Sequence, residues 1–118
     1  MKVFVKLKES TIERNLQTIQ TMLLYGKIKL SCISYSQRIR NRSLYIMDLR
    51  HCISAYNCSE FIMCLKILSV DILLCKDMNE RKTLLNVFNS YVNFNPFIGD
   101  KRFENNKEII LRQMQIRK

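Results

Sequence analysis

Three arginines alternate along a short polar segment of the chain, with a tyrosine on either side. The arginines are Arg38, Arg40 and Arg42, and the aromatic residues are Tyr35 and Tyr45. A guanidinium group binds two phosphate oxygens at once or stacks on a base, and aromatic faces beside arginine are typical of single-stranded RNA recognition. The cluster therefore predicts contact with RNA. The alternative interpretation is a solvated loop whose tyrosines border the core.

Positive charge gathers at both ends of the chain, which has a net charge of +10. Residues 1–50 contain ten Lys or Arg and three acids, whereas residues 51–100 contain four and five. No acid occurs between Glu13 and Asp48. Such an excess repels itself in a folded chain, and a polyanion offsets the repulsion. The candidate nucleic-acid contacts are Arg14, Lys27, Lys29, Tyr35, Arg38, Arg40, Arg42, Tyr45, Lys101, Arg102, Lys107 and Arg112.

The C-terminal segment 103–118 combines cations with the apolar residues Ile109, Ile110 and Met114. This pattern predicts a basic amphipathic helix that binds RNA, a groove on a partner protein or a lipid surface. The alternative is an ordinary surface helix whose last cations suit the helix dipole.

Catalytic and metal-binding patterns are weak in this sequence. His51 is the single histidine, and Cys52, Cys58 and Cys64 are separated by five residues each, unlike the close cysteine pairs of zinc knuckles. Two isolated glycines do not make a phosphate-binding loop. We therefore expect no metal, no cofactor and no enzymatic activity.

The cysteines and the N-terminus predict a cytoplasmic protein. Five cysteines are an odd number, and several fall in apolar helical patterns, so a disulfide framework is not expected. The first residues mix lysines with acids and do not read as a secretory signal. Lys66 and Asp71 interrupt the most apolar segment, which is also shorter than a membrane span of about 20 residues. We expect no transmembrane segment.

The N-terminal part, residues 1–42, predicts a small strand-helix-strand unit. Apolar and polar residues alternate over 2–8 and again over 27–33, as in half-buried strands. Between them, Ser10 and Glu13 form a capping box for a helix over 11–25 that ends at Gly26. The polar residues 36–43 have no apolar face and predict a surface loop.

The remaining chain predicts helices. Ser43 can cap a helix that ends near Asn57, and Ser59 can cap a central buried helix over 60–75. Asp77 and Glu80 predict the start of a helix that reaches Val92, and the last helix begins near Phe103. The fold class expected is thus mainly α, formally α+β, with a bundle of about four helices.

We expect one domain over residues 1–118, because a chain of this length holds one adequate core. It would comprise the basic N-terminal part, a helical core over 43–92 and the basic C-terminal helix over 103–118. The leading hypothesis is a small RNA-associated protein, a structural component or bound factor of a large ribonucleoprotein such as the ribosome, with neighbouring proteins as further partners. The high apolar content, 47%, favours an alternative. This is a helical protein-protein interaction module, such as a viral host-factor binder or a small subunit of an assembly, with an apolar groove around the 60–92 helices.

Overall fold

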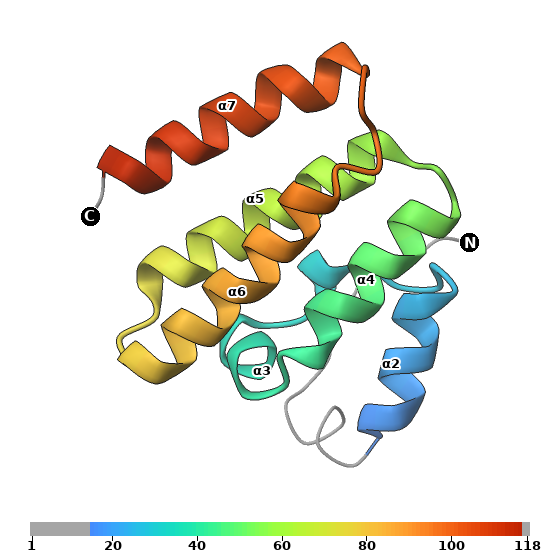
Figure 1. Ribbon diagram of the computed structural model, residues 1–118. Helices are drawn as coiled ribbons and strands as arrows, with labels where there is room; N and C mark the ends of the chain where they lie inside the picture. The colour runs from blue at the N-terminus through green and yellow to red at the C-terminus, as the bar shows by residue number, and fades with distance from the viewer. Residues whose placement is uncertain (1–14, 117–118) are drawn as a thin grey trace.

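The computed structural model of the protein describes residues 15–116, of which 78% are helical and none lies in a strand (Figure 1). The elements, in chain order, are α2 (Leu16–Leu24), the 3-10 turn η1 (Leu30–Cys32), α3 (Tyr35–Arg40), α4 (Ser43–Ser54), α5 (Cys58–Leu74), α6 (Met78–Phe94) and α7 (Lys101–Ile116).

Helix α5 forms the centre of the bundle. It contacts α4, α6 and α7, while α2 packs on α4 (Figure 1). Its sequence is apolar on most sides, and the side chains of Phe61, Leu65, Leu68 and Ile72 are buried. A helix that is apolar nearly all round is stable only when other helices cover it. One cluster of buried side chains accordingly draws on α2, α4, α5, α6 and α7.

Side-chain caps fix where three helices begin. The Asp77 carboxylate accepts hydrogen bonds from the backbone N–H groups of Asn79 and Glu80, at 2.9 and 3.1 Å, as the sequence predicts for α6. Asn57, rather than the expected Ser59, caps α5 by accepting from the N–H of Glu60. Ser34 caps α3 in the same way through the N–H of Gln37.

The predicted strand-helix-strand unit is wrong, because residues 27–33 form no strand. Leu30 and Ile33 do bury their side chains, but the neighbouring elements are helices that offer no free backbone groups for pairing. The segment instead closes its own hydrogen bonds, from the N–H of Cys32 to Lys29 and from that of Ile33 to Leu30. The other predicted strand, residues 2–8, lies outside the described residues. Over residues 15–116 the fold is all-α.

The surface loop predicted over 36–43 is also wrong, because most of it is helix α3. Gln37 is fully buried there, and the side chain of Arg38 is only 13% exposed. Polar residues thus occupy core positions where apolar ones are expected. Arg38 meets a buried partner, Asp71, whereas Gln37 accepts a hydrogen bond from the Asn41 amide through Oε1 and leaves its Nε2 without a partner within the described residues.

The other predicted helices match observed ones. The predictions over 43–57, 60–75 and from Asp77 correspond to α4, α5 and α6, and the last helix begins at Lys101, slightly earlier than expected. Helix α2 covers the later part of the predicted helix 11–25, whose start lies outside the described residues. Within residues 15–116, no helix combines the length and apolar content needed to cross a bilayer.

Candidate functional site

Arg38, at the centre of the predicted RNA-binding cluster, turns into the protein. Its guanidinium donates to both carboxylate oxygens of Asp71, from Nε at 2.7 Å and from Nη2 at 3.1 Å, and also to the carbonyl of Ile33. The Asp71 side chain is only 2% exposed. Buried charges in this geometry satisfy each other, so the guanidinium fork of Arg38 is occupied inside the fold.

Tyr45, one of the two predicted stacking residues, is fully buried. Its hydroxyl donates to Oδ2 of Asp71 at 2.5 Å. Burial and this hydrogen bond raise the pKa of Tyr45 above its ordinary value. Tyr35 lies on α3, partly buried, and burial raises its pKa as well. Arg38 and Tyr45 are therefore brought together around Asp71 rather than at the surface.

Four other predicted contacts make intramolecular ion pairs at the surface. Lys29 pairs with Glu60 at 3.5 Å, and Arg42 pairs with Glu80 at 3.2 Å. The remaining two pairs lie at the start of α7 and join Arg102 to Asp100 at 3.0 Å and Lys107 to Glu104 at 3.5 Å. Exposed pairs of this kind break easily when a stronger partner arrives.

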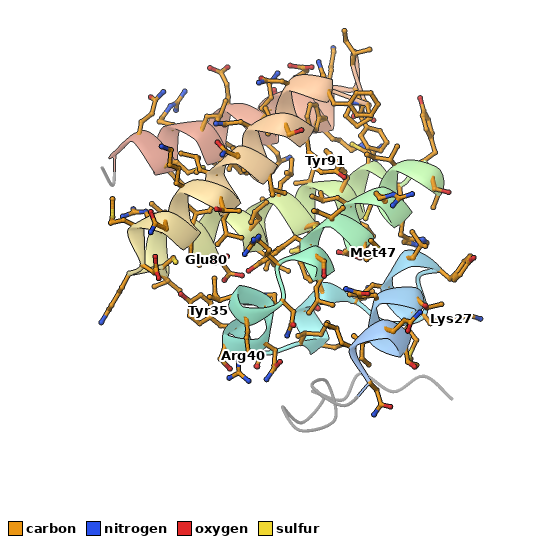
Figure 2. All side chains as sticks on the ribbon, turned by 60° about the horizontal axis from the view of Figure 1, so that its bottom comes forward. Lys27, Tyr35, Arg40, Met47, Glu80 and Tyr91 are labelled. Atoms are coloured by element: carbon orange, nitrogen blue, oxygen red, sulfur yellow. The ribbon has the colours of Figure 1, made fainter. Side chains whose placement is uncertain are left out.

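The remaining predicted residues do not form one patch. Figure 2 shows Lys27 projecting from the turn that follows α2 and Arg40 from α3, at separate places on the molecule. Lys101 and Arg112 are exposed on α7. Arg14 lies outside the described residues. The predicted RNA contacts thus come from several elements that face different directions.

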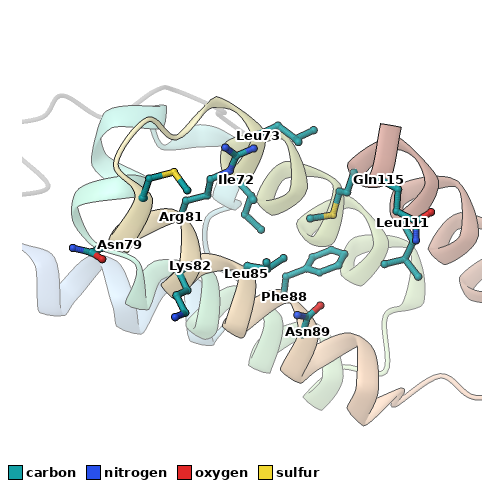
Figure 3. Close-up of a pocket in the computed structure, with 12 residues that line it drawn as sticks. Ile72, Leu73, Asn79, Arg81, Lys82, Leu85, Phe88, Asn89, Leu111 and Gln115 are labelled. Carbon is teal, nitrogen blue, oxygen red and sulfur yellow. The ribbon is translucent and has the colours of Figure 1, made fainter. Parts of the chain in front are cut away.

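A groove of about 670 Å³ opens between α5, α6 and α7 (Figure 3). Its apolar lining comes from all three helices and consists of Ile72, Leu73, Met78, Leu85, Phe88, Leu111 and Met114. Its polar lining consists of Asn79, Arg81, Lys82, Asn89 and Gln115. This volume lies within the range of pockets that hold ligands.

The groove exists because α6 and α7 diverge. Both helices pack against α5, and they meet at the turn that links them. From that turn they separate towards the first residues of α6 and the last of α7 (Figure 1). Asn95 and Gly99, at φ values of +50° and +86°, give this turn its shape. The apolar side of α6 is therefore left partly uncovered.

Large apolar side chains are exposed in and beside this groove. Met78 is 71% exposed and Leu85 is 36% exposed, although both lie in the groove lining. Leu74, next in sequence to the lining residue Leu73, is also exposed. Contiguous exposed apolar surface on a folded protein marks sites of interaction.

Two cations border the groove. Arg81 and Lys82 belong to its lining, and within residues 15–116 neither makes an ion pair. No acidic residue occurs among the described residues that line it. Sequence reasoning placed an apolar groove on the 60–92 helices but missed the α7 wall and these cations. Leu111 and Met114, which widen the apolar stripe of α7 beyond the buried Phe103 and Ile110, were the available signal.

A smaller cleft of about 190 Å³ lies on another part of the surface and includes Lys29, Asp48, Glu60 and Cys64 in its lining. Burial raises the pKa of Asp48 to about 6, although a hydrogen bond from Cys64 acts in the opposite direction. Among the described residues, no three His, Cys, Asp or Glu side chains are placed to hold a metal ion.

All five cysteines are buried free thiols. Burial raises the pKa of Cys52 to about 12 and that of Cys64 well above its ordinary value. These two thiols are therefore protonated at neutral pH.

The chain matches no protein-family model, and searches of curated proteins and of solved structures likewise find no match.

Proposed function

We propose that the protein is a helical protein-interaction module that binds a segment of another protein in the groove between α5, α6 and α7. The observation that supports this most is the exposure of Met78 and Leu85 in the lining of a groove whose floor is apolar. Leaving such side chains in water is unfavourable, and a partner that covers them gains about 25 cal/mol for each Å² of apolar surface removed from water.

The shape of the groove suits an α-helix. Met78, Leu85 and Phe88 line it from a single helix, and the ten helical steps from Met78 to Phe88 span about 15 Å. An amphipathic helix of about three turns has this length, and its side chains at positions i, i+3 or i+4 and i+7 would meet the floor. The opposite wall, with Leu111 and Met114, would contact its other side.

The ribonucleoprotein hypothesis has narrower support. Its arginine-tyrosine cluster is divided, because Arg38 and Tyr45 contact Asp71 and Arg42 contacts Glu80. The net charge of +10 still favours an anionic partner, so RNA is a defined outcome of the test rather than a parallel proposal.

The test is isolation of the affinity-tagged chain from cells after ribonuclease digestion, with groove and control variants side by side. Met78→Gln and Leu85→Gln place an amide in the groove. Ile109→Gln is the matched control, since Ile109 is an exposed apolar residue of α7 outside the lining.

We expect a stoichiometric protein partner to remain with the wild type and with Ile109→Gln, and to be lost from both groove variants. Retention of the partner by Met78→Gln and Leu85→Gln would place binding elsewhere and contradict the proposal. Loss of every partner from the wild type on digestion would favour RNA association instead.

A further inference from the structure

We infer that the segment received by the groove is an acidic amphipathic helix of a partner protein. This inference rests on the proposed function and adds the charge of the partner. Its basis is the combination of an apolar floor with a border that holds two cations and, among its described residues, no acid.

The two cations are available to a partner. Arg81 and Lys82 are neighbours on α6, and neither is held by an ion pair within residues 15–116. The nearest acids in the sequence have other partners. Asp77 accepts hydrogen bonds at the start of α6, and Glu80 pairs with Arg42. The positive charge at this border is therefore not neutralised within the described fold.

A helix with carboxylates flanking its apolar stripe complements this border. The apolar side chains would enter the floor, while carboxylates beside them would reach Arg81 and Lys82. An arginine takes two carboxylate oxygens in a planar arrangement, which fixes orientation as well as charge. The amides of Asn79 and Gln115 supply further hydrogen-bond donors at the edge.

The charge of the whole chain acts in the same direction. A net charge of +10 attracts acidic partners and repels basic ones, and such complementarity sets encounter rate and partner choice. It also opposes a second copy of this chain as the occupant, because association of two copies would bring two net charges of +10 together.

The experiment uses the full chain and three synthetic helical peptides of about 15 residues with one shared leucine face. Their outer positions carry Glu, Gln or Lys. Binding is measured by fluorescence anisotropy at about 0.05 M and about 0.3 M salt, on either side of physiological screening. We expect the Glu peptide to bind about tenfold tighter than the Gln peptide at low salt, and the Lys peptide to bind weakest.

Two charge variants separate the border from the net charge. Arg81→Gln/Lys82→Gln is expected to reduce the difference in affinity between the Glu and Gln peptides to about twofold. Its affinity for the Gln peptide should stay as in the wild type. Lys27→Gln/Lys66→Gln removes the same number of exposed charges outside the groove and is expected to keep the full preference. Circular dichroism verifies that each variant is folded. The salt dependence is measured on the wild type alone. Higher salt should weaken binding of the Glu peptide and leave binding of the Gln peptide nearly unchanged.

The outcomes separate the inference from the proposed function. Equal affinity for the three peptides, lost in Leu85→Gln, would overturn the acidic partner and leave the groove as a binding site. A preference for Glu that both charge variants reduce equally would also overturn the inference, because it would reflect net charge alone. If no peptide binds and a single-stranded RNA of similar length does, the inference and the proposed function both fail.

Discussion

Asp71 joins three elements of the fold through a single carboxylate. It lies on α5 and accepts hydrogen bonds from Arg38 of α3 and from Tyr45 of α4. In the sequence it is only a charge that interrupts an apolar helix. A buried carboxylate is tolerated when its lone pairs are satisfied, and here an arginine fork and a phenol satisfy them.

Removal of one member of this buried group should be much more destabilising than removal of a surface ion pair. Arg38→Ala leaves Asp71 buried without its countercharge, so we expect the free energy of unfolding to fall by about 3 kcal/mol. Tyr45→Phe removes one hydrogen bond, with an expected loss of about 1 kcal/mol. Urea denaturation followed by circular dichroism measures both. Arg42→Ala, which breaks the exposed pair with Glu80, is the control and should lose less than about 1 kcal/mol. Equal losses for Arg38→Ala and Arg42→Ala would contradict this assignment.

Asp48 makes stability depend on pH in a predictable direction. Burial raises its pKa from 3.8 to about 6, so the folded state binds the proton more tightly than the unfolded state. Its contribution is most favourable below about pH 4, and stability is lost as the pH rises from about 4 to about 6.

We therefore expect Asp48→Asn to be more stable than the wild type at pH 7, by about 1 to 2 kcal/mol, and to match it near pH 4. Urea midpoints at a series of pH values test this. Glu108→Gln, which removes an exposed carboxylate of α7, is measured beside it as the control. A difference between Asp48→Asn and the wild type that does not vary with pH would show that Asp48 is not the titrating group.

The end of α2 depends on a glycine for two reasons. Gly26 has a φ of +71°, and a Cβ built on it would overlap with the imidazole of His51 on α4. Gly99 has a similar φ of +86°, but its Cβ would meet no atom within 4 Å. His51 thus lies against the turn that follows α2.

The two glycines form a matched pair for measurement. Gly99→Ala should lower the free energy of unfolding by about 1 kcal/mol because of its backbone conformation. Gly26→Ala should lower it by at least about 2 kcal/mol because steric overlap with His51 is added. Thermal unfolding of the two variants gives the comparison. In the Gly26→Ala background, His51→Ala should restore part of the lost stability. If the two glycine variants lose the same stability, His51 does not restrict this turn.

The elements that sequence predicted well carry their signals locally. The Asp77 cap directly precedes α6, and the apolar stripes of α4 and α5 lie on the helices that they predict. The errors at 27–33 and 36–43 arose because an alternating or polar pattern does not specify what faces it. Leu30 faces helices rather than a strand, and Arg38 faces Asp71, which is 33 residues away. The α7 wall of the groove was missed for the same reason, because it depends on how helices that are distant in the sequence diverge in the fold.

On the scale of the whole molecule, repulsion among cations should make stability rise with moderate salt. The chain has twenty Lys or Arg and ten acids, so ion pairing leaves an excess of positive charge. Screening at about 0.15 M salt has a length of about 8 Å and should reduce the repulsion more than it weakens the few exposed pairs.

We expect the midpoint of thermal unfolding to increase as sodium chloride is raised from near zero to about 0.2 M. The Lys27→Gln/Lys66→Gln variant, which has two fewer charges, should show a smaller increase. A midpoint that decreases over this range would mean that attractive pairs, rather than repulsion, dominate the electrostatics of the fold.

The five buried thiols give the molecule internal reporters of its own opening. They lie at η1, on α4, on α5 and just after α5, so an alkylating reagent reaches each one only when a different part of the bundle separates. Cys64, at the centre of α5, should be modified at the rate of global unfolding, and Cys58, in the first turn of that helix, should react through smaller fluctuations. Mass spectrometry of intact chains during alkylation would then rank the cooperative units of this fold without any introduced label.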